Sequence, residues 1–175
     1  MNFRATRILA AALLASSCGL AIGATKTTTF AVTATVVSNC FINSASAMAF
    51  GNYTPGAGNV DQTSTILVRC SNATPYGIGL NEGTAGTPSF APRVLTSGSV
   101  TGTLEYNLYT DVAGGNVWLN PANAAAVATN QGGTGTGLGN VLTHTVYGRL
   151  LDSTLSQAAT PAANYTSTVT VTINY

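Results

Sequence analysis

Two cysteines and one histidine are the side chains of this sequence best suited to bond formation, metal binding or acid–base chemistry. Cys40 and Cys70 remain once an N-terminal segment carrying Cys18 is removed, and an even pair in an oxidising compartment is typical of a disulfide. Closing a loop of about 30 residues stabilises a fold by roughly 3–4 kcal/mol. Because a metal site needs more ligands than this pair and His144 provide, we predict a disulfide and neither metal nor cofactor.

His144 is also the only histidine available as the base of a Ser-His-Asp arrangement, with Asp111 or Asp152 to orient it. No nucleophile-elbow motif accompanies it, and a histidine within a β-run is more often structural or exposed. The five acidic residues are scattered, so their spacing indicates no carboxylate pair. We therefore predict that the protein is not an enzyme.

The first 24 residues have the pattern of a secretory signal. Arg4 and Arg7 precede an apolar run over residues 8–20, and small residues follow it. Polar residues interrupt the run, which falls short of the roughly 20 apolar residues of a membrane-spanning helix. Cys18 lacks the leucine that usually stands three positions before a lipoprotein cysteine. We expect cleavage near Ala24, which leaves 151 of the 175 residues, enough for one domain.

The mature chain carries little charge. Two of the six basic residues lie in the predicted signal, so four basic and five acidic residues remain, a net charge of −1. This balance argues against electrostatic binding to nucleic acid or to an anionic membrane. Charged residues make up 6% of the chain, against about 25% in ordinary soluble domains. Weak charge repulsion suits a secreted protein that packs against copies of itself.

Apolar and polar residues alternate in short runs separated by Gly, Pro, Asn and Ser. Alternation with a period of two places the apolar side chains on one face of a strand, and several such runs are typical of an all-β sandwich. The runs cover residues 65–70, 76–80, 104–109, 142–150 and 168–175. Residues 123–140 are instead small and glycine-rich, which predicts a flexible surface loop.

The aromatic residues near the middle of the chain admit two interpretations. The run over residues 104–109 places Tyr106 on its apolar face and the polar Asn107 on the opposite one. Tyr106, Tyr109 and Trp118 could line a sugar-binding face, which makes a carbohydrate-binding module one alternative. Aromatic side chains more often pack in a core, and we expect core packing here.

A further run, residues 27–37, follows the signal directly. Phe30, Val32, Ala34 and Val36 alternate with threonines and an alanine. A strand needs partners for its backbone and for its apolar face. This segment is therefore either the first strand of its own sheet or a strand intended for another molecule.

Motifs spread over residues 40–175 resemble the spore coat U domain family, the pilin-like subunits of archaic chaperone–usher pili. They are Cys40 with Phe-Gly-Asn-Tyr at 50–53, Cys70 followed by Tyr-Gly-Ile at 76–78, Leu-Glu-Tyr-Asn-Leu-Tyr-Thr-Asp at 104–111 before Trp118, Val-Tyr-Gly-Arg-Leu at 146–150, and Tyr165 with Val-Thr-Val-Thr-Ile-Asn-Tyr at 169–175. Two loop details differ from the family pattern: no glycine stands two residues before Tyr165, and Leu-Asn-Pro follows Trp118.

The resemblance implies an incomplete immunoglobulin-like β-sandwich, the pilin fold, which is completed by donor-strand complementation. A periplasmic chaperone would lend the missing strand, and at the outer-membrane usher the N-terminal segment of another copy would replace it. The implied organisation is a signal over 1–24, a donor strand over 25–38 and a sandwich domain over 39–175. The implied donor residues are Phe30, Val32, Ala34 and Val36, and the implied acceptor and chaperone-binding residues are Val169, Val171, Ile173 and Tyr175.

The family's role implies a pilus subunit that passes through the periplasm to the cell surface and supports adhesion and biofilm formation. Its partners would be copies of itself, the chaperone, the usher and a tip adhesin subunit. Only about fifteen residues separate the signal from Cys40, so we do not expect a receptor-binding domain ahead of the sandwich. A coat protein whose N-terminal strand fills its own groove remains the alternative.

Overall fold

The computed structural model describes five stretches of the chain. They are residues 23–87, 89–90, 92–120, 131–162 and 164–175. Residues 1–22 of the predicted signal and residues 123–130 of the predicted loop lie outside them. Contacts between Cα atoms divide the chain into two units, Met1–Thr35 and Val36–Tyr175.

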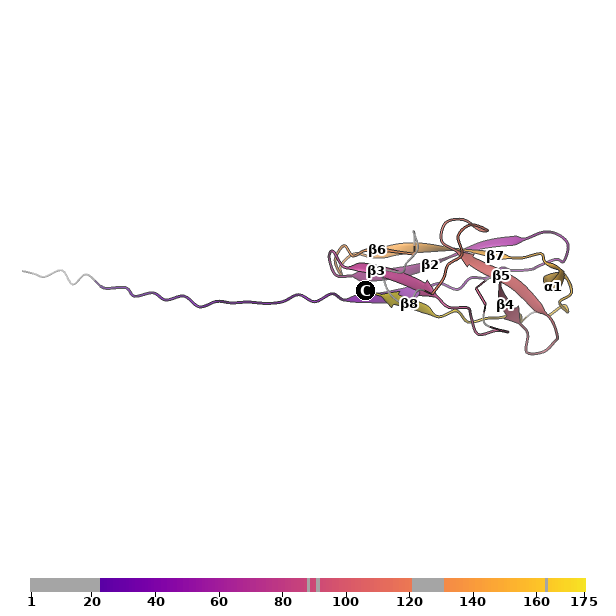
Figure 1. Ribbon diagram of the computed structural model, residues 1–175, viewed down its shortest axis with the longest axis horizontal. Helices are drawn as coiled ribbons and strands as arrows, with labels where there is room; N and C mark the ends of the chain where they lie inside the picture. The colour runs from indigo at the N-terminus through magenta and orange to yellow at the C-terminus, as the bar shows by residue number, and fades with distance from the viewer. Residues whose placement is uncertain (1–22, 88, 91, 121–130, 163) are drawn as a thin grey trace, which may run out of the picture. The chain divides into compact units, whose positions relative to one another are not determined.

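The second unit consists of two antiparallel sheets, which confirms the predicted all-β fold (Figure 1). The five-stranded sheet has the order β1-β2-β7-β5-β4, and the three-stranded sheet has the order β6-β3-β8. The strands are β1 (Cys40–Ala45), β2 (Val60–Cys70), β3 (Pro75–Leu80), β4 (Arg93–Thr96), β5 (Thr103–Tyr109), β6 (Gly132–Thr134), β7 (Leu142–Leu150) and β8 (Val171–Asn174). In the described stretches the one helix is α1 (Thr154–Gln157), and no helix is long and apolar enough to cross a membrane.

The alternating runs at 65–70, 76–80, 104–109 and 142–150 form β2, β3, β5 and β7. The predicted flexible loop needs correction, because its residues 132–134 form β6 and pair with β3. A Cβ atom on Gly132 would overlap the Tyr76 carbonyl oxygen, so only glycine permits this close approach. Asn107, predicted on a polar face, is instead 4% exposed.

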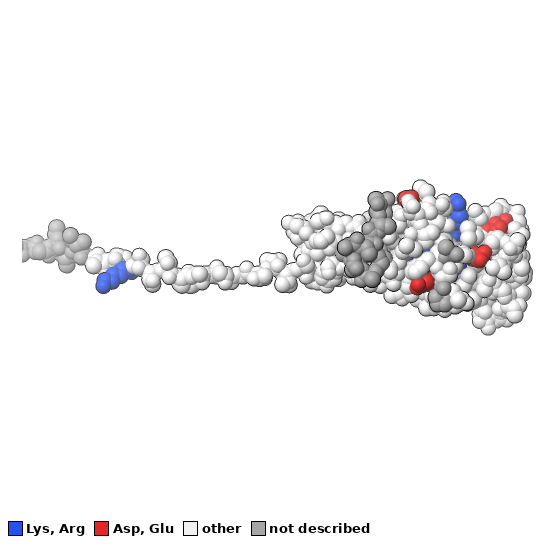
Figure 2. Space-filling view, in the orientation of Figure 1, with Lys and Arg blue, Asp and Glu red and all other residues white. Residues whose placement is uncertain are grey.

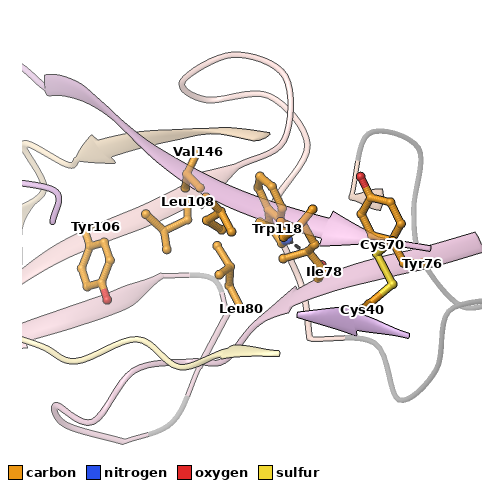
Figure 3. Packing of buried hydrophobic residues seen from close by; sticks show 11 residues of the cluster. Cys40, Cys70, Tyr76, Ile78, Leu80, Tyr106, Leu108, Trp118 and Val146 are labelled. Atoms are coloured by element: carbon orange, nitrogen blue, oxygen red, sulfur yellow. Dashed lines mark hydrogen bonds between the residues drawn. A yellow bond between two sulfur atoms is a disulfide. The ribbon is translucent and has the colours of Figure 1, made fainter. Parts of the chain in front are cut away.

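The hydrophobic core contains side chains from both sheets (Figure 3). Its fully buried members include Trp118, Ile78 and Val68, and Trp118 Nε1 donates to the Ile78 carbonyl oxygen at 2.9 Å. Tyr106 and Tyr109 are also buried. Core packing therefore accounts for all three of the aromatic side chains that might have bound a sugar.

The predicted disulfide joins Cys40 to Cys70, two residues that face each other in the β1–β2 ladder. Both cysteines belong to the core cluster, beside Tyr76 in Figure 3. The bond thus fixes one end of β1 against its neighbour. Beyond Ile42 the register of β1 shifts by one residue, before the strand ends at Ala45.

A buried arginine links the two sheets. Arg93 in β4 is 1% exposed, and its Nη2 donates to the carbonyl oxygens of Leu80 at 3.1 Å and Trp118 at 2.6 Å. Its Nε donates to the Asn81 carbonyl oxygen at 2.9 Å, and its guanidinium lies 5.0 Å from the centre of the Phe90 ring. Burial lowers the pKa of Arg93 to about 10, so the group stays charged at neutral pH.

Residues 23–39 contain no strand, and every one of them is exposed. Phe30, Val32 and Val36 have exposed fractions of 86%, 82% and 91%. Large apolar side chains at such exposure have no apolar surface around them. The apolar face predicted for residues 27–37 is thus exposed.

Candidate functional site: an apolar groove

A groove of about 990 Å³ opens in the second unit. Its floor is built from both sheets by apolar side chains of the strands, namely Ile66, Leu80, Leu95, Leu104, Tyr106, Leu108, Val146 and Leu150. Its two walls are extended segments outside or at the ends of strands, one over residues 45–50 and one over residues 165–171. None of the described lining residues is charged, so the groove offers no counter-charge to a charged occupant. Charge is also sparse on the face shown in Figure 2.

The wall over residues 165–171 leads into β8 and keeps the side-chain alternation of a strand. Tyr165, Ser167 and Val169 are partly buried and line the groove, whereas the residues between them are exposed. Ser167 Oγ is buried and lies near the hydroxyl of Tyr106 at the floor. Burial is the main reason why the pKa of Tyr106 is raised, so this hydroxyl stays neutral.

The backbone of this wall is bonded on one side only. Toward β3, the Asn81 N–H donates to the Thr170 carbonyl oxygen at 3.1 Å, and Thr170 N–H donates to Asn81 Oδ1 at 2.7 Å. Successive residues of a strand send their N–H and C=O groups to opposite sides. Val169, Val171 and Ile173 therefore direct theirs away from β3, toward an edge to which no strand is hydrogen-bonded among the described residues.

The wall over residues 45–50 continues from β1. Ala45 still pairs with Ile66 of β2, and Ser46 Oγ lies 3.2 Å from Ser64 Oγ. Beyond them Met48 and Phe50 point inward, and the Phe50 ring lies 6.0 Å from that of Tyr106. The wall is therefore anchored at its start by β2 and farther along by packing on the floor.

The predicted acceptor residues do not all occupy the same environment. Val169 and Val171 line the groove, and Ile173 packs against the core beyond it. Tyr175, in contrast, is 55% exposed. The groove thus ends before the last predicted acceptor position.

The residues considered for catalysis lie in separate places. His144 Nε2 is 2.8 Å from the Tyr76 hydroxyl, and burial lowers the pKa of this imidazole. Asp111 accepts from backbone N–H groups of its own loop, those of Val112 and Asn116. Asp152 binds the 53–58 turn instead, through Tyr53 and backbone N–H groups. No group of three His, Cys, Asp or Glu side chains suited to a metal occurs in the stretches that the structure covers.

Sequence reasoning missed the wall formed by Met48 and Phe50. The signal was present, because Ala-Met-Ala-Phe over residues 47–50 alternates small with large apolar residues. The run is only four residues long, so it resembles a loop in sequence. In the structure it follows the register shift of β1. Arg93 was missed because a lone arginine gives no sign of burial.

Comparisons with known proteins give a matching family and similar solved structures. The family model described as Spore Coat Protein U domain matches residues 26–172. No curated protein matches the chain. A similar solved structure is that of the CsuC–CsuE chaperone–tip adhesion subunit pre-assembly complex from archaic chaperone–usher Csu pili of Acinetobacter baumannii, with 21% identity and a TM-score of 0.44. The match covers 81% of this chain and 40% of that one.

Proposed function

This chain belongs to the Spore Coat Protein U domain family, and we propose that it is a structural subunit of a secreted surface fibre, an archaic chaperone–usher pilus assembled by donor-strand exchange. The observation that carries the proposal is an apolar groove with an unpaired strand edge in a chain that also has an exposed, alternating apolar segment. The groove has an apolar floor and an open strand edge, and the segment has an apolar face and backbone groups to pair. Insertion of the segment of one copy into the groove of another satisfies both.

The dimensions of the two parts agree. Residues 27–37 are eleven residues long, and the wall together with β8, residues 165–174, is ten residues long. An extended segment of eleven residues spans roughly 36 Å. Burial of Phe30, Val32, Ala34 and Val36 contributes on the order of 5–9 kcal/mol before ordering costs.

The inserted strand also gains backbone hydrogen bonds. Val169, Val171 and Ile173 offer N–H and C=O groups along the open edge, and a donor strand beside them extends the sheet. In the proposed pathway the signal over residues 1–24 is removed on secretion. A periplasmic chaperone then occupies this edge until the usher exchanges it for the donor segment of the next subunit. The fibre would support adhesion and biofilm formation, with a tip adhesin subunit at its end.

The proposal is tested by charging one face of the donor segment. Val32→Asp puts a carboxylate on the face that enters the apolar groove, whereas Thr33→Asp puts the same charge on the opposite face. Both variants should be secreted, but only Thr33→Asp should form oligomers that resist SDS without heating. Uptake of a labelled peptide of residues 25–38 by the mature protein gives a second measurement.

Two outcomes contradict the proposal. Oligomers of the Val32→Asp variant equal to those of the unaltered protein would exclude this strand as the donor. A stable monomer of the mature protein, purified without a chaperone and unable to take up the peptide, would identify a self-complemented coat protein. Size-exclusion chromatography distinguishes the oligomers of the first outcome from the monomer of the second.

A further inference from the structure

The groove wall over residues 45–50 carries a methionine in an unusual position. The sequence has two methionines, Met1 and Met48, and Met1 lies in the predicted signal. Met48 is therefore the single thioether of the proposed mature subunit. It is partly buried and lines the groove, so one side of the residue packs on the core while another reaches solvent.

The surroundings of Met48 suit a thioether and not a more polar group. Its Sδ packs so closely over Gly148 of β7 that a Cβ atom on that glycine would overlap it. The Phe50 ring also approaches Gly148. Its Cζ atom would lie 3.2 Å from a Cβ atom added to that glycine. The nearby hydroxyl of Ser46 is already bonded to Ser64 and Thr65. A new oxygen on the sulfur would therefore lack a hydrogen-bond donor under an inserted strand.

We propose that Met48 is an oxidation site that controls strand uptake, an inference that rests on the function proposed above. The reactant is a hydroperoxide such as hydrogen peroxide. A lone pair of Sδ attacks one oxygen of hydrogen peroxide, an S–O bond forms and the O–O bond breaks. The second oxygen takes up the proton of the attacked oxygen and leaves as water. The sulfur is oxidised by two electrons to the sulfoxide, and the peroxide is reduced. The sulfoxide places a polar oxygen in a wall of the groove.

The reaction distinguishes free subunits from assembled ones. In the free subunit Met48 borders an open groove and is accessible to a small oxidant. A strand lying between the two walls covers it. Oxidation therefore blocks subunits whose groove is empty and spares those in which a strand, from the chaperone or from another subunit, already lies between the walls. Because methionine sulfoxide is reducible by dedicated reductases, the block is reversible.

The test compares peptide uptake before and after exposure to hydrogen peroxide. The mature protein is treated, the oxygen gain at Met48 is verified by mass spectrometry, and the uptake rate of labelled peptide 25–38 is measured. We expect oxidation to slow uptake at least about tenfold, which corresponds to about 1.4 kcal/mol. Treatment with methionine sulfoxide reductase should restore the rate.

Two controls separate this site from other damage. In the Met48→Leu variant, the ratio of treated to untreated uptake rates should stay near one, whatever the absolute rate of that variant. Pre-formed oligomers should gain far less oxygen at Met48 than free subunits under the same treatment.

The outcomes also separate this inference from the proposed function. Equal uptake by fully oxidised and untreated protein, or equal oxygen gain in free and assembled protein, overturns the oxidation site and leaves strand exchange standing. An untreated protein that takes up no peptide overturns both.

Discussion

Arg93 Nη1 donates to Asn107 Oδ1 at 2.6 Å, and both side chains are buried. In turn, Asn107 Nδ2 donates to the Phe90 carbonyl oxygen at 2.7 Å. The pair connects β4 to β5 in one sheet, while the rest of the guanidinium reaches the end of β3 in the other. A positive charge is thus held in the interior mainly by neutral oxygen acceptors.

Removal of this arginine should be severely destabilising. Arg93→Ala removes the donor that the buried carbonyl oxygens of Leu80 and Trp118 share and leaves Asn107 Oδ1 with the Leu108 N–H alone, so we expect a loss of at least about 3 kcal/mol in the free energy of unfolding. Urea titration measures it. Arg69→Ala is the matched control, because Arg69 makes an exposed bond to the Leu138 carbonyl oxygen, and it should cost less than about 1 kcal/mol. Equal losses in both variants would contradict the buried network.

The disulfide should contribute through the unfolded chain. The Cys40→Ala/Cys70→Ala double variant frees a loop of about 30 residues, and we expect its free energy of unfolding to fall by roughly 3–4 kcal/mol. Urea titration of the unaltered protein with a reductant should show a similar fall, while the double variant should not respond to the reductant. A reductant effect that persists in the double variant would mean that the loss has another origin.

Acid should weaken the contact between the 53–58 turn and the end of β7. The pKa of Asp152 is lowered to about 2, first by the Tyr53 hydroxyl and then by the Gly56 and Gly58 N–H groups, although the carboxylate is at the surface. A lowered folded pKa stabilises the protein above the unfolded value of 3.8, and this stabilisation is lost as the pH falls toward 2. The melting temperatures of the unaltered protein and Asp152→Asn should therefore converge between about pH 4 and pH 2.

A constant difference between those two melting curves over this pH range would contradict the assignment. A direct control is the chemical shift of the Asp152 carboxyl carbon. It should titrate at a pH well below that at which unperturbed aspartates titrate.

Gly148 should be intolerant of even one added carbon. Gly148→Ala places a methyl group against Met48 Sδ and the Phe50 ring, and the wall must move or the strand must bend. We expect a loss of about 1–3 kcal/mol in the free energy of unfolding, measured by urea titration. Gly139→Ala meets no atom within 4 Å and should change stability by less than about 0.5 kcal/mol. A neutral Gly148→Ala would show that the wall yields freely.

The strands that the sequence predicted are those whose own side chains alternate. β7 was predicted with both ends in place, because Leu142, Val146 and Leu150 share a face over nine residues. β6 could not be predicted in this way, since Gly-Gly-Thr has no apolar alternation and pairs only because its glycines fit against β3. β8 is shorter than the run over 168–175, although the side-chain alternation begins earlier, at Tyr165.

The groove was harder to predict than the donor segment. A donor segment is continuous in sequence, so its alternation is visible over residues 27–37. The groove is the space between two walls more than 100 residues apart, and only the fold brings Met48 and Val169 to its two sides. The donor residues remain a prediction, since their insertion into a groove is itself proposed.

Trp118 gives this protein a natural spectroscopic reporter. It is the single tryptophan of the chain, it is fully buried, and it does not line the groove. Its indole N–H is bound to β3, and its carbonyl oxygen is bound to Arg93 of the opposite sheet. Its fluorescence should therefore shift to longer wavelength when the sheets separate and stay nearly constant when a strand enters the groove. One optical signal can thus distinguish a subunit that has unfolded from a folded subunit whose groove holds no donor strand.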